Sequence, residues 1–370
     1  MQRLNVLFAV LAFSLVSLPA FASSQDPKGD SLEGRMQALE STQAEIYHTL
    51  AEKKAAGLAS RITERITLSG LIEVEATAEG IDFADGGSDA ASDLVLATAQ
   101  LGFGLELTES LSGDLIFLFE EDATDLEVDE AAVNLELGPW SGRIGRQYLP
   151  FGVYNSHFVS DPLTLELGET RETALLAGYG RDLFTVSAFV FNGDAEKAGA
   201  EDHIRDWGVS LAVTPLEGIA LGASYLSDLA DTDADLLGGA DYGERTGAWS
   251  AYLVAAWRQL EFSGEYLGAT GAFAAADLDA DGNGAGDEPA AWNLEIAWYP
   301  SGTLEVAARY EGSDQFAGQP ETQYGLCTSW GAWENVSLSL EFLHGEFEAA
   351  FAEAGEEERE LVTAQLAFEF

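Results

Sequence analysis

Residues 292–298 have the sequence Trp292-Asn293-Leu294-Glu295-Ile296-Ala297-Trp298, in which large apolar side chains occupy every second position. Successive side chains of a β-strand point to opposite faces, so this stretch predicts a strand with one apolar and one polar face. The same alternation occurs at 304–310 and 336–342. It is typical of strands that face lipid on one side and water on the other, as in a transmembrane barrel.

This alternation recurs over most of the chain. From residue 64 onward we find about sixteen segments of roughly ten residues, the length of a strand that crosses an outer membrane. They lie at 64–79, 93–108, 112–122, 126–138, 140–148, 170–180, 183–193, 204–214, 218–228, 246–257, 259–269, 290–300, 302–312, 320–331, 335–346 and 358–370. We therefore expect an all-β transmembrane barrel of about 16 antiparallel strands, preceded by a short N-terminal coiled-coil helix.

The connections between these segments alternate in length. The short ones lie at 109–111, 139, 181–182, 215–217, 259, 302 and 332–334, and the mostly longer ones at 80–92, 123–125, 149–169, 194–203, 229–245, 270–289, 313–319 and 347–357. Outer-membrane barrels have short periplasmic turns and longer outer loops, so this alternation predicts a bacterial outer-membrane location. All eight Trp lie near predicted strand ends, where aromatic girdles meet the two membrane interfaces.

The chain ends in Phe370, in phase with the apolar face of the last predicted strand. A terminal aromatic on the lipid face resembles the signal that barrel-assembly machinery reads. We therefore expect that machinery as a partner, together with the lipid bilayer and lipopolysaccharide.

The first residues predict export and self-association. Residues 1–22 combine Arg3, an apolar run from Leu4 to Leu18 and the cleavage pattern Ala20-Phe21-Ala22, as in a signal peptide. Residues 23–62 are expected to form a periplasmic coiled-coil segment and linker, and 63–370 the barrel. Within 31–56, the seam residues fall at alternating steps of four and three: Leu32, Met36, Leu39, Gln43, Ile46 and Leu50. This seam predicts a homotrimer, with packing of the helix on its own barrel as the alternative.

Composition excludes several functions. With 64 Asp and Glu against 17 Lys and Arg, the formal net charge is −47, which repels nucleic acid. One Cys allows no disulfide framework, and four scattered His make a His-rich metal site implausible. Ser156 and His157 are adjacent, which points their side chains apart, and no G-x-S-x-G or H-E-x-x-H motif occurs. We expect no enzyme activity, no catalytic residues and no required cofactor.

The loop 149–169 differs from the other long loops because it is less charged and more apolar. Its large apolar residues are Phe151, Tyr154, Phe158, Leu163, Leu165 and Leu167. In sixteen-stranded porins the loop at this place folds inward and narrows the pore, and burial inside the barrel would explain these side chains. The alternative is a loop that lies across the barrel mouth or in a subunit interface.

Two runs in and beside this loop resemble a known family. They are Gly145-Arg146-Gln147-Tyr148-Leu149-Pro150-Phe151-Gly152 and Ser160-Asp161-Pro162-Leu163-Thr164-Leu165-Glu166-Leu167-Gly168-Glu169-Thr170-Arg171-Glu172. Over about 28 residues this is similar to the LbtU-type siderophore porins, in which G-R-x-Y-x-P-F-G precedes D-P-L-T-x-E-L-G-E-T-x-E. The resemblance implies an outer-membrane protein that takes up a ferric siderophore without the plug domain of gated receptors. The resemblance does not identify which residues of this sequence bind the ligand.

The candidate constriction residues follow from the loop and its flanks. They are Arg143, Arg146, Phe151, Tyr154, Asp161, Glu166, Glu169, Arg171, Glu172 and Arg309. Opposed acids and bases at a pore neck set a transverse field that orients charged solutes. Equally, such pairs can pin the loop to the wall. Residue parity directs Arg143 into the lumen and leaves the direction of Arg146 open.

The rest of the predicted lumen face is acidic. Against Arg143 and Arg309, the residues of inward parity include Glu73, Glu106, Glu136, Glu261, Glu265, Glu295, Glu305 and Glu341. A wall of this kind favours cations. Each of these acids is otherwise explained as a solvated wall residue.

One loop carries a Ca²⁺-binding pattern. Residues 277–288 fit D-x-D-x-[DN]-G-x5-E, with Gly282 at the sharp turn. The predicted ligands are Asp277, Asp279, Asp281, Asn283 and Glu288. The alternative is an acidic, exposed loop. Asp231, Asp233 and Asp235 have a similar spacing without the turn glycine.

Three functions therefore stay open. The first is a porin for a ferric siderophore or a similar small solute, narrowed by the loop 149–169. The second is a general cation-preferring diffusion porin, and the third is an envelope tether or adhesin that uses the coiled coil and the Ca²⁺ loop.

Overall fold

The computed structural model describes residues 65–199 and 203–370 of the chain. The predicted signal peptide at 1–22 and the predicted coiled-coil segment at 23–62 lie outside the described residues and stay predictions. Among the described helices, none is both long and apolar enough to cross a membrane.

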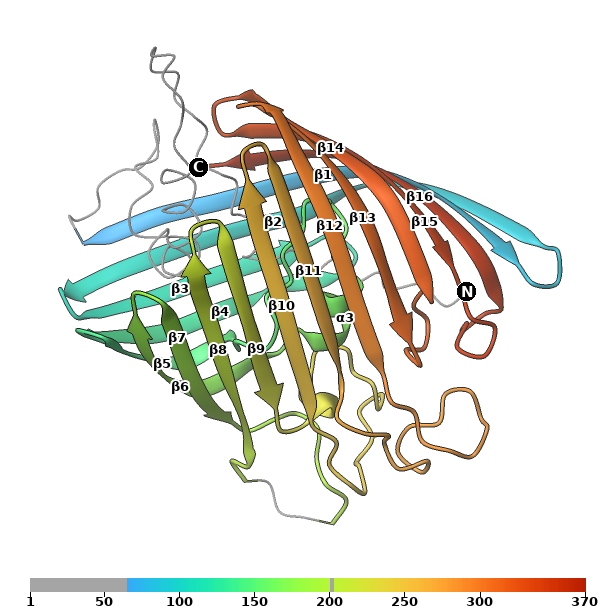
Figure 1. The fold of residues 1–370 in the computed structure, drawn as a ribbon, viewed down its shortest axis with the longest axis horizontal. Helices are drawn as coiled ribbons and strands as arrows, with labels where there is room; N and C mark the ends of the chain where they lie inside the picture. The colour runs from blue at the N-terminus through green and yellow to red at the C-terminus, as the bar shows by residue number, and fades with distance from the viewer. Residues whose placement is uncertain (1–64, 200–202) are drawn as a thin grey trace.

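Sixteen antiparallel strands close into a barrel in which each strand pairs with its neighbours along the chain (Figure 1). The strands are β1 (Ile66–Phe83), β2 (Ser88–Thr108), β3 (Leu111–Glu120), β4 (Thr124–Leu137), β5 (Trp140–Tyr148), β6 (Arg171–Arg181), β7 (Phe184–Phe191), β8 (Asp206–Leu216), β9 (Ile219–Leu226), β10 (Ala248–Trp257), β11 (Leu260–Ala269), β12 (Ala290–Ser301), β13 (Leu304–Asp314), β14 (Thr322–Trp333), β15 (Val336–Glu346) and β16 (Glu356–Glu369). The predicted class and the predicted strand number are both confirmed.

The two ends of the barrel have different connections. After β2, β4, β6, β8, β10, β12 and β14, only two residues separate the strands. Several of these turns contain a residue of positive φ, such as Gly138 (63°), Gly218 (77°) and Asn335 (64°), as tight hairpins require. The connections at the other end include the long segments 149–170, 192–205, 227–247 and 270–289. The described segments contain two short helices, α3 (Leu163–Gly168) after β5 and the 3-10 turn η1 (Leu229–Asp231) after β9.

The alternation along β12 separates an outer face from an inner one. Leu294, Ile296 and Trp298 are 42%, 47% and 49% exposed, whereas Asn293 and Glu295 between them are only 3% and 1% exposed. The apolar face therefore points outward, where in a soluble protein it would face water. This arrangement fits only a lipid environment.

Tilted aromatic pairs form an outer girdle at the loop end of neighbouring strands. The ring centroids are 5.3 Å apart in Trp207–Tyr225, 5.0 Å in Trp249–Tyr266 and 4.9 Å in Trp292–Tyr310. Such rings prefer the membrane–water interface, so these pairs mark the upper edge of the lipid-facing belt.

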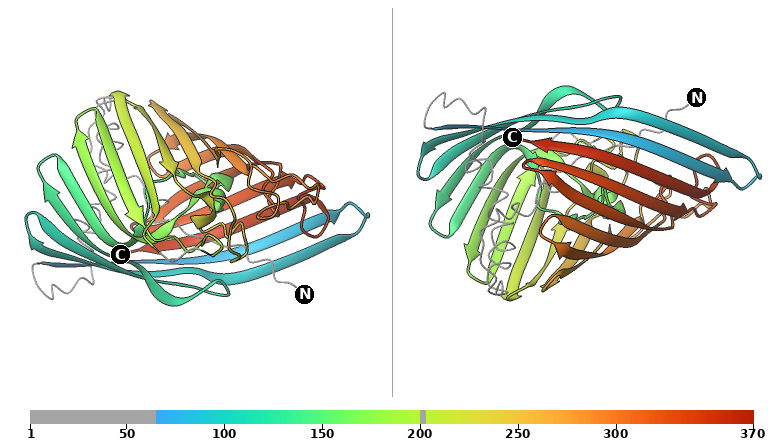
Figure 2. Two further views of the ribbon diagram at one scale, coloured as in Figure 1. Left: turned by 90° about the horizontal axis from the view of Figure 1, so that it is seen from below. Right: turned by 90° about the horizontal axis from the view of Figure 1, so that it is seen from above.

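The β1–β2 hairpin corrects one prediction. We expected a loop at 80–92, but β1 continues to Phe83, and the pairs Ile81–Asp89 and Asp82–Ser88 extend the ladder. Figure 2 shows this hairpin projecting beyond the neighbouring strands. Residues 88–93 are all exposed, because here both faces of the ribbon lie beyond the membrane. The apolar alternation that identifies a strand within lipid is lost for that reason.

The C-terminus closes the barrel against β1. Gly70 N–H donates to the Phe370 carbonyl at 2.9 Å, and Phe370 N–H donates to the Gly70 carbonyl at 3.0 Å. A Cβ at residue 70 would collide with the ring of Phe370. Glycine at this position therefore lets the terminal aromatic lie flat on the first strand.

Candidate functional site

The candidate site is the segment 149–170, which leaves β5 and returns at β6 after crossing to the opposite inner wall. Figure 1 shows α3, which belongs to this segment, behind β11 and β12. α3 packs against β11, β12 and β13. The segment thus occupies the inside of the barrel.

Apolar packing fixes the two ends of this segment. Phe151 and Leu167 are fully buried, and they share a cluster with Leu226 and Leu267 from β9 and β11. In the middle, Phe158 joins a second cluster with Ala297, Ala307, Cys327 and Leu343. Inward-facing apolar residues on β9–β15 therefore receive the apolar residues of the loop, which explains why this loop is less polar than the others.

Glu265 on β11 binds the first turn of the loop through two backbone amides. Val153 N–H donates to Oε1 and Tyr154 N–H to Oε2, both at 2.8 Å. Next to this pair, Gly152 N–H donates to Ser224 Oγ at 3.0 Å. The Tyr154 backbone is in the left-handed region (φ 53°), which turns these amides toward the wall.

His157 joins the loop to three further wall carboxylates. Its N–H donates to Glu295 Oε2 at 2.7 Å, its Nδ1 lies 2.7 Å from Glu305 Oε1, and its Nε2 lies 3.7 Å from Glu261 Oε1. Burial by itself lowers the pKa of His157, but the hydrogen bond to Glu305 and the three nearby carboxylates raise it to about 9. The imidazolium form is therefore favoured at neutral pH.

Glu341 and Glu311 anchor the second half of the loop. Val159 N–H and Ser160 N–H donate to Glu341 Oε2 at 2.7 and 3.0 Å. Leu163 N–H, at the start of α3, donates to Glu311 Oε2 at 2.9 Å. A hydrogen bond to a charged group contributes about 1.5–3 kcal/mol, so these contacts together fix the loop strongly.

Arg309 lies at the centre of this arrangement and is fully buried. Its Nε lies 2.8 Å from Glu295, and its Nη1 lies 3.3 Å from Glu311. The same guanidinium donates to the carbonyls of Ser160 and Asp161, at 2.9 and 3.3 Å. Arg309 also lies over the ring of Phe158, 4.4 Å from its centroid. It therefore neutralises the wall acids and binds loop carbonyls at once.

The other predicted cations pair with acids of their own wall. Arg143 lies 3.2 Å from Asp114 and 2.5 Å from Glu130. Arg171 lies 2.8 Å from Glu127 and 2.6 Å from Asp129. These ion pairs join β3, β4, β5 and β6 side by side.

Arg146 lies near two carboxylates at the loop end of the barrel. Its charge acts on Glu172, the second residue of β6, and on Asp233 of the β9–β10 loop. Gly145 has φ +137° and lies directly against the backbone of Ala131. The pairing of β5 with β4 and β6 nevertheless continues through Gly145 and Arg146 without a register shift.

Of the predicted loop acids, Glu169 is buried, whereas Asp161 and Glu166 are half-buried. Phe151 and Tyr154 form the apolar core of the segment beside them. Burial raises the pKa of Asp161 and Glu169 well above their usual range, and that of Glu166 to about 7. These carboxyl groups therefore carry less negative charge at neutral pH than their number suggests.

The predicted Ca²⁺ loop brings some of its acids together. Asp279, Asp281 and Asp287 each offer an oxygen within 4.8 Å of the others. Asp277 instead accepts hydrogen bonds from Gly243 N–H and Glu244 N–H of the neighbouring loop, at 2.9 and 3.2 Å. Asn283 N–H donates to Asp281, and Glu288 N–H donates to Gln315.

Sequence reasoning missed some members of the site. It placed Glu265, Glu295 and Glu341 on the inner wall, but as acids that face the lumen and not as acceptors for loop amides. It did not single out Glu311 or Ser224. Alternation reveals that a side chain faces inward, but nothing in the local pattern shows that a loop distant in the sequence supplies its hydrogen-bond partner.

Comparison with solved structures identifies the fold. The outer-membrane channel DcaP of Acinetobacter baumannii is similar with a TM-score of 0.61 and 14% identity, over 82% of this chain and 97% of that chain. An anion-selective porin from Comamonas acidovorans matches with a TM-score of 0.61 and 13% identity, over 82% and 99%. OmpF of Salmonella typhi matches with a TM-score of 0.56 and 12% identity, over 82% and 97%.

The fold is therefore that of an outer-membrane porin, and the apolar belt places the barrel in the bacterial outer membrane. No family model matches the chain. A UPF0422 protein of Coxiella burnetii is 26% identical over 227 residues, which are 57% of this chain and 48% of the relative. A UPF0422 protein of Legionella pneumophila is 22% identical over 313 residues, which are 75% and 58%. The chain spans about half the length of the curated relatives that it matches.

Proposed function

We propose that this protein is a channel, rather than an enzyme, through which a ferric siderophore or a similar small solute crosses the outer membrane. The observation that carries the proposal is the anchoring of the segment 149–170 to Glu265, Glu295 and Glu341 on the inner wall. Sixteen strands enclose a lumen wider than side chains alone can fill. A loop fixed inside that lumen narrows it, and the passage then selects solutes by size and charge.

The siderophore as substrate class is supported by the resemblance to the LbtU-type siderophore porins. The two runs that carry it, 145–152 and 160–172, include Leu149, Phe151 and the whole of α3. These residues form the two buried ends of the anchored loop. The resemblance therefore covers the part of the chain that sets the width of the passage.

A second candidate function is a general diffusion pore that prefers cations. It is favoured by the net charge of −47 and by Glu73 and Glu75 on β1. Each of these two carboxylates has one buried oxygen without a hydrogen-bond partner among the described residues. An inner wall rich in acids favours cations.

Planar-bilayer recording of the refolded barrel distinguishes the two functions. In KCl gradients, with candidate ferric siderophores added one by one, saturable block by one of them at micromolar concentration supports siderophore passage. Open, cation-selective conductance that no siderophore changes supports the general pore.

Two partners are proposed from the chain ends. Residues 31–56 would join three barrels through the predicted coiled coil, and their deletion should turn a trimer into a monomer in light scattering. Phe370 would be read by barrel-assembly machinery, so Phe370→Ser should reduce the amount of folded barrel in the outer membrane. The same protein should still refold in detergent, because its strand pairing is intact.

A structural Ca²⁺ ion is proposed for the loop 277–288, with Asp279, Asp281, Asn283 and Glu288 among its predicted ligands and Asp287 brought beside them. Asp279→Ala with Glu288→Ala should abolish a Ca²⁺-dependent rise of the melting temperature that this loop causes. Calorimetric titration of the double variant should count one Ca²⁺ per chain fewer than that of the parent, and an unchanged count moves the ion elsewhere.

A further inference from the structure

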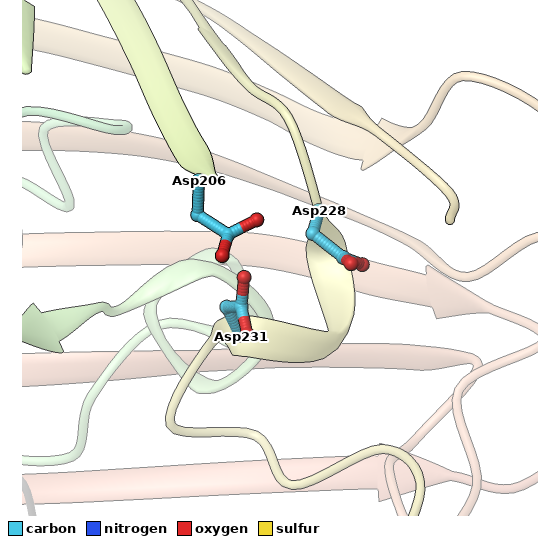
Figure 3. A group of neighbouring side chains, drawn as sticks. All are labelled: Asp206, Asp228 and Asp231. Atoms are coloured by element: carbon cyan, nitrogen blue, oxygen red, sulfur yellow. The ribbon is translucent and has the colours of Figure 1, made fainter. Parts of the chain in front are cut away.

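Three aspartates that are far apart in the sequence meet at the loop end of the barrel (Figure 3). Asp206 is the first residue of β8, Asp228 precedes η1 and Asp231 is the last residue of η1. One carboxylate oxygen of each lies within 4.8 Å of an oxygen of the other two. Figure 3 shows the carboxylates of Asp206 and Asp231 facing one another, with Asp228 beside them.

All three side chains are withdrawn from water. Asp206 is 5% exposed, Asp228 is 1% exposed and Asp231 is 4% exposed. Asp231 Oδ1 accepts a hydrogen bond from Ala195 N–H at 3.1 Å. Its other oxygen, Oδ2, is buried and has no hydrogen-bond partner among the described residues. A buried carboxylate oxygen in this situation is costly, and it has coordination capacity to offer to a cation.

The charges of this cluster do not balance. Arg245 is its cation, with Nη2 2.6 Å from Asp206 Oδ1 and Nε 3.4 Å from Asp228 Oδ2. One guanidinium against three ionised carboxylates leaves two negative charges, and the nearby Glu172 adds to them. Burial, and then the charges of Asp206 and Asp228, raise the pKa of Asp231 to about 9. The cluster therefore favours a bound proton or a further cation.

The surrounding backbone makes room for the Asp231 carboxylate. A Cβ at residue 193 would collide with it, so glycine at Gly193 lets the β7–β8 segment pass directly over this side chain. Gly193 N–H also lies 3.4 Å from Asp206 Oδ2. Three chain segments thus converge on the cluster: the β7–β8 connection, the start of β8 and the β9–β10 connection.

The number of carboxylates and their withdrawal from water fit Ca²⁺ better than Mg²⁺. Ca²⁺ binds oxygen ligands at roughly 2.3–2.6 Å, so ligands on opposite sides of the ion lie about 5 Å apart. Mg²⁺ requires near-ideal octahedral geometry at about 2.0–2.1 Å and retains its waters. Three buried carboxylates with oxygens within 4.8 Å of one another are a donor set of the kind that Ca²⁺ accepts and that Mg²⁺, which keeps several waters, does not favour.

We propose that Asp206, Asp228 and Asp231 form a Ca²⁺ site that ties the β7–β8 and β9–β10 loops together at the loop end of the barrel. The ion would offset the excess negative charge and satisfy the free oxygen of Asp231. The site shares no ligand with the acidic cluster of the loop 277–288, and none of its three residues belongs to the segment 149–170.

The test is thermal unfolding of the full-length refolded protein in detergent free of lipopolysaccharide, at pH 7.5. The background carries Asp279→Ala and Asp281→Ala, which remove the other acidic cluster. Ca²⁺ is titrated after chelation, with Mg²⁺ and with NaCl of equal ionic strength in parallel. A ligand that binds only the folded state raises the melting temperature progressively with its concentration.

We expect Ca²⁺ to raise the melting temperature in this background and in the matched control Asp241→Asn, an exposed acid of the same β9–β10 loop. Asp231→Asn should lose the Ca²⁺ effect, because the amide cannot supply the negative charge of the third carboxylate. Calorimetric titration of the background protein should give one Ca²⁺ per chain, and this measurement needs no cluster variant to fold.

Three results would overturn the proposal. The first is an equal rise of the melting temperature with Mg²⁺ or NaCl, which shows that the ions only screen the negative charges. The second is a Ca²⁺ effect that survives Asp231→Asn. The third is indifference to Ca²⁺ in the background, which shows that the cluster binds only a proton.

Discussion

The wall made by β9–β15 and the wall made by β3–β6 use inward-facing charged side chains in different ways. On β9–β15, Glu265, Glu295 and Glu341 accept hydrogen bonds from backbone amides of the segment 149–170. On β3–β6, Arg143 and Arg171 pair with acids of neighbouring strands. The first wall therefore binds a loop, whereas the charged side chains of the second wall form ion pairs with one another across neighbouring strands.

This difference shows that the charge of a lumen residue does not by itself define what the residue does. Carboxylates that bind two amides no longer face the passage as free charges. Selectivity should therefore depend more on the β1–β6 side than on the larger number of acids on the β9–β15 side.

The largest expected effect comes from removing the buried cation of the anchored wall. Arg309→Met leaves Glu295 and Glu311 buried without their partner and releases two loop carbonyls. Breaking one side of a buried ion pair costs about 3–5 kcal/mol, so the loop should detach and single-channel conductance should rise. Arg143→Met is the matched control on the β3–β6 wall and should leave the loop in place. Equal conductance changes in the two variants would remove the distinction between the walls.

A smaller effect is expected from removing one anchor. Glu265→Ala deletes the acceptor of the Val153 and Tyr154 amides, each such bond contributing about 1.5–3 kcal/mol. We expect faster proteolysis within 150–160 and noisier channel currents. Glu106→Ala, at an exposed position of inward parity on β2, is the control and should change neither. Protection from protease that is unaffected by Glu265→Ala counts against amide anchoring.

The smallest effect should come from pH. His157 has a pKa of about 9 in the folded barrel, above its ordinary value of 6.5. Its stabilising contribution is therefore complete below pH 6.5 and is lost as pH rises through about 9. Current noise from loop motion should increase between pH 7 and 10 in the parent protein. In His157→Asn this pH dependence should be reduced; a noise profile identical to the parent's would exclude His157 as its source.

The sequence predicted the barrel, the strand number and the alternation of turns and loops, because lipid imposes a period of two on each spanning strand. Where the β1–β2 hairpin leaves the lipid, the pattern ends and the prediction of a loop at 80–92 was wrong. The apolar residues of 149–169, such as Phe151 and Leu167, indicated a buried loop, because a loop exposed to water does not need large apolar side chains.

The sequence did not predict which groups individual charged side chains bind. Arg309 lies about 150 residues from the loop carbonyls that it binds, and this pairing depends on strand register and on the path of the loop. The cluster of Asp206, Asp228 and Asp231 could not be predicted for the same reason, since these residues meet only after the barrel has closed.

The central claim is that the anchored segment 149–170 narrows the passage, and deletion of 155–165 tests it most directly. The deletion removes the amides that bind Glu295, Glu341 and Glu311 while leaving all sixteen strands intact. Single-channel conductance of the folded variant should rise clearly above that of the parent. Unchanged conductance in a variant that folds with the same β content would contradict the claim.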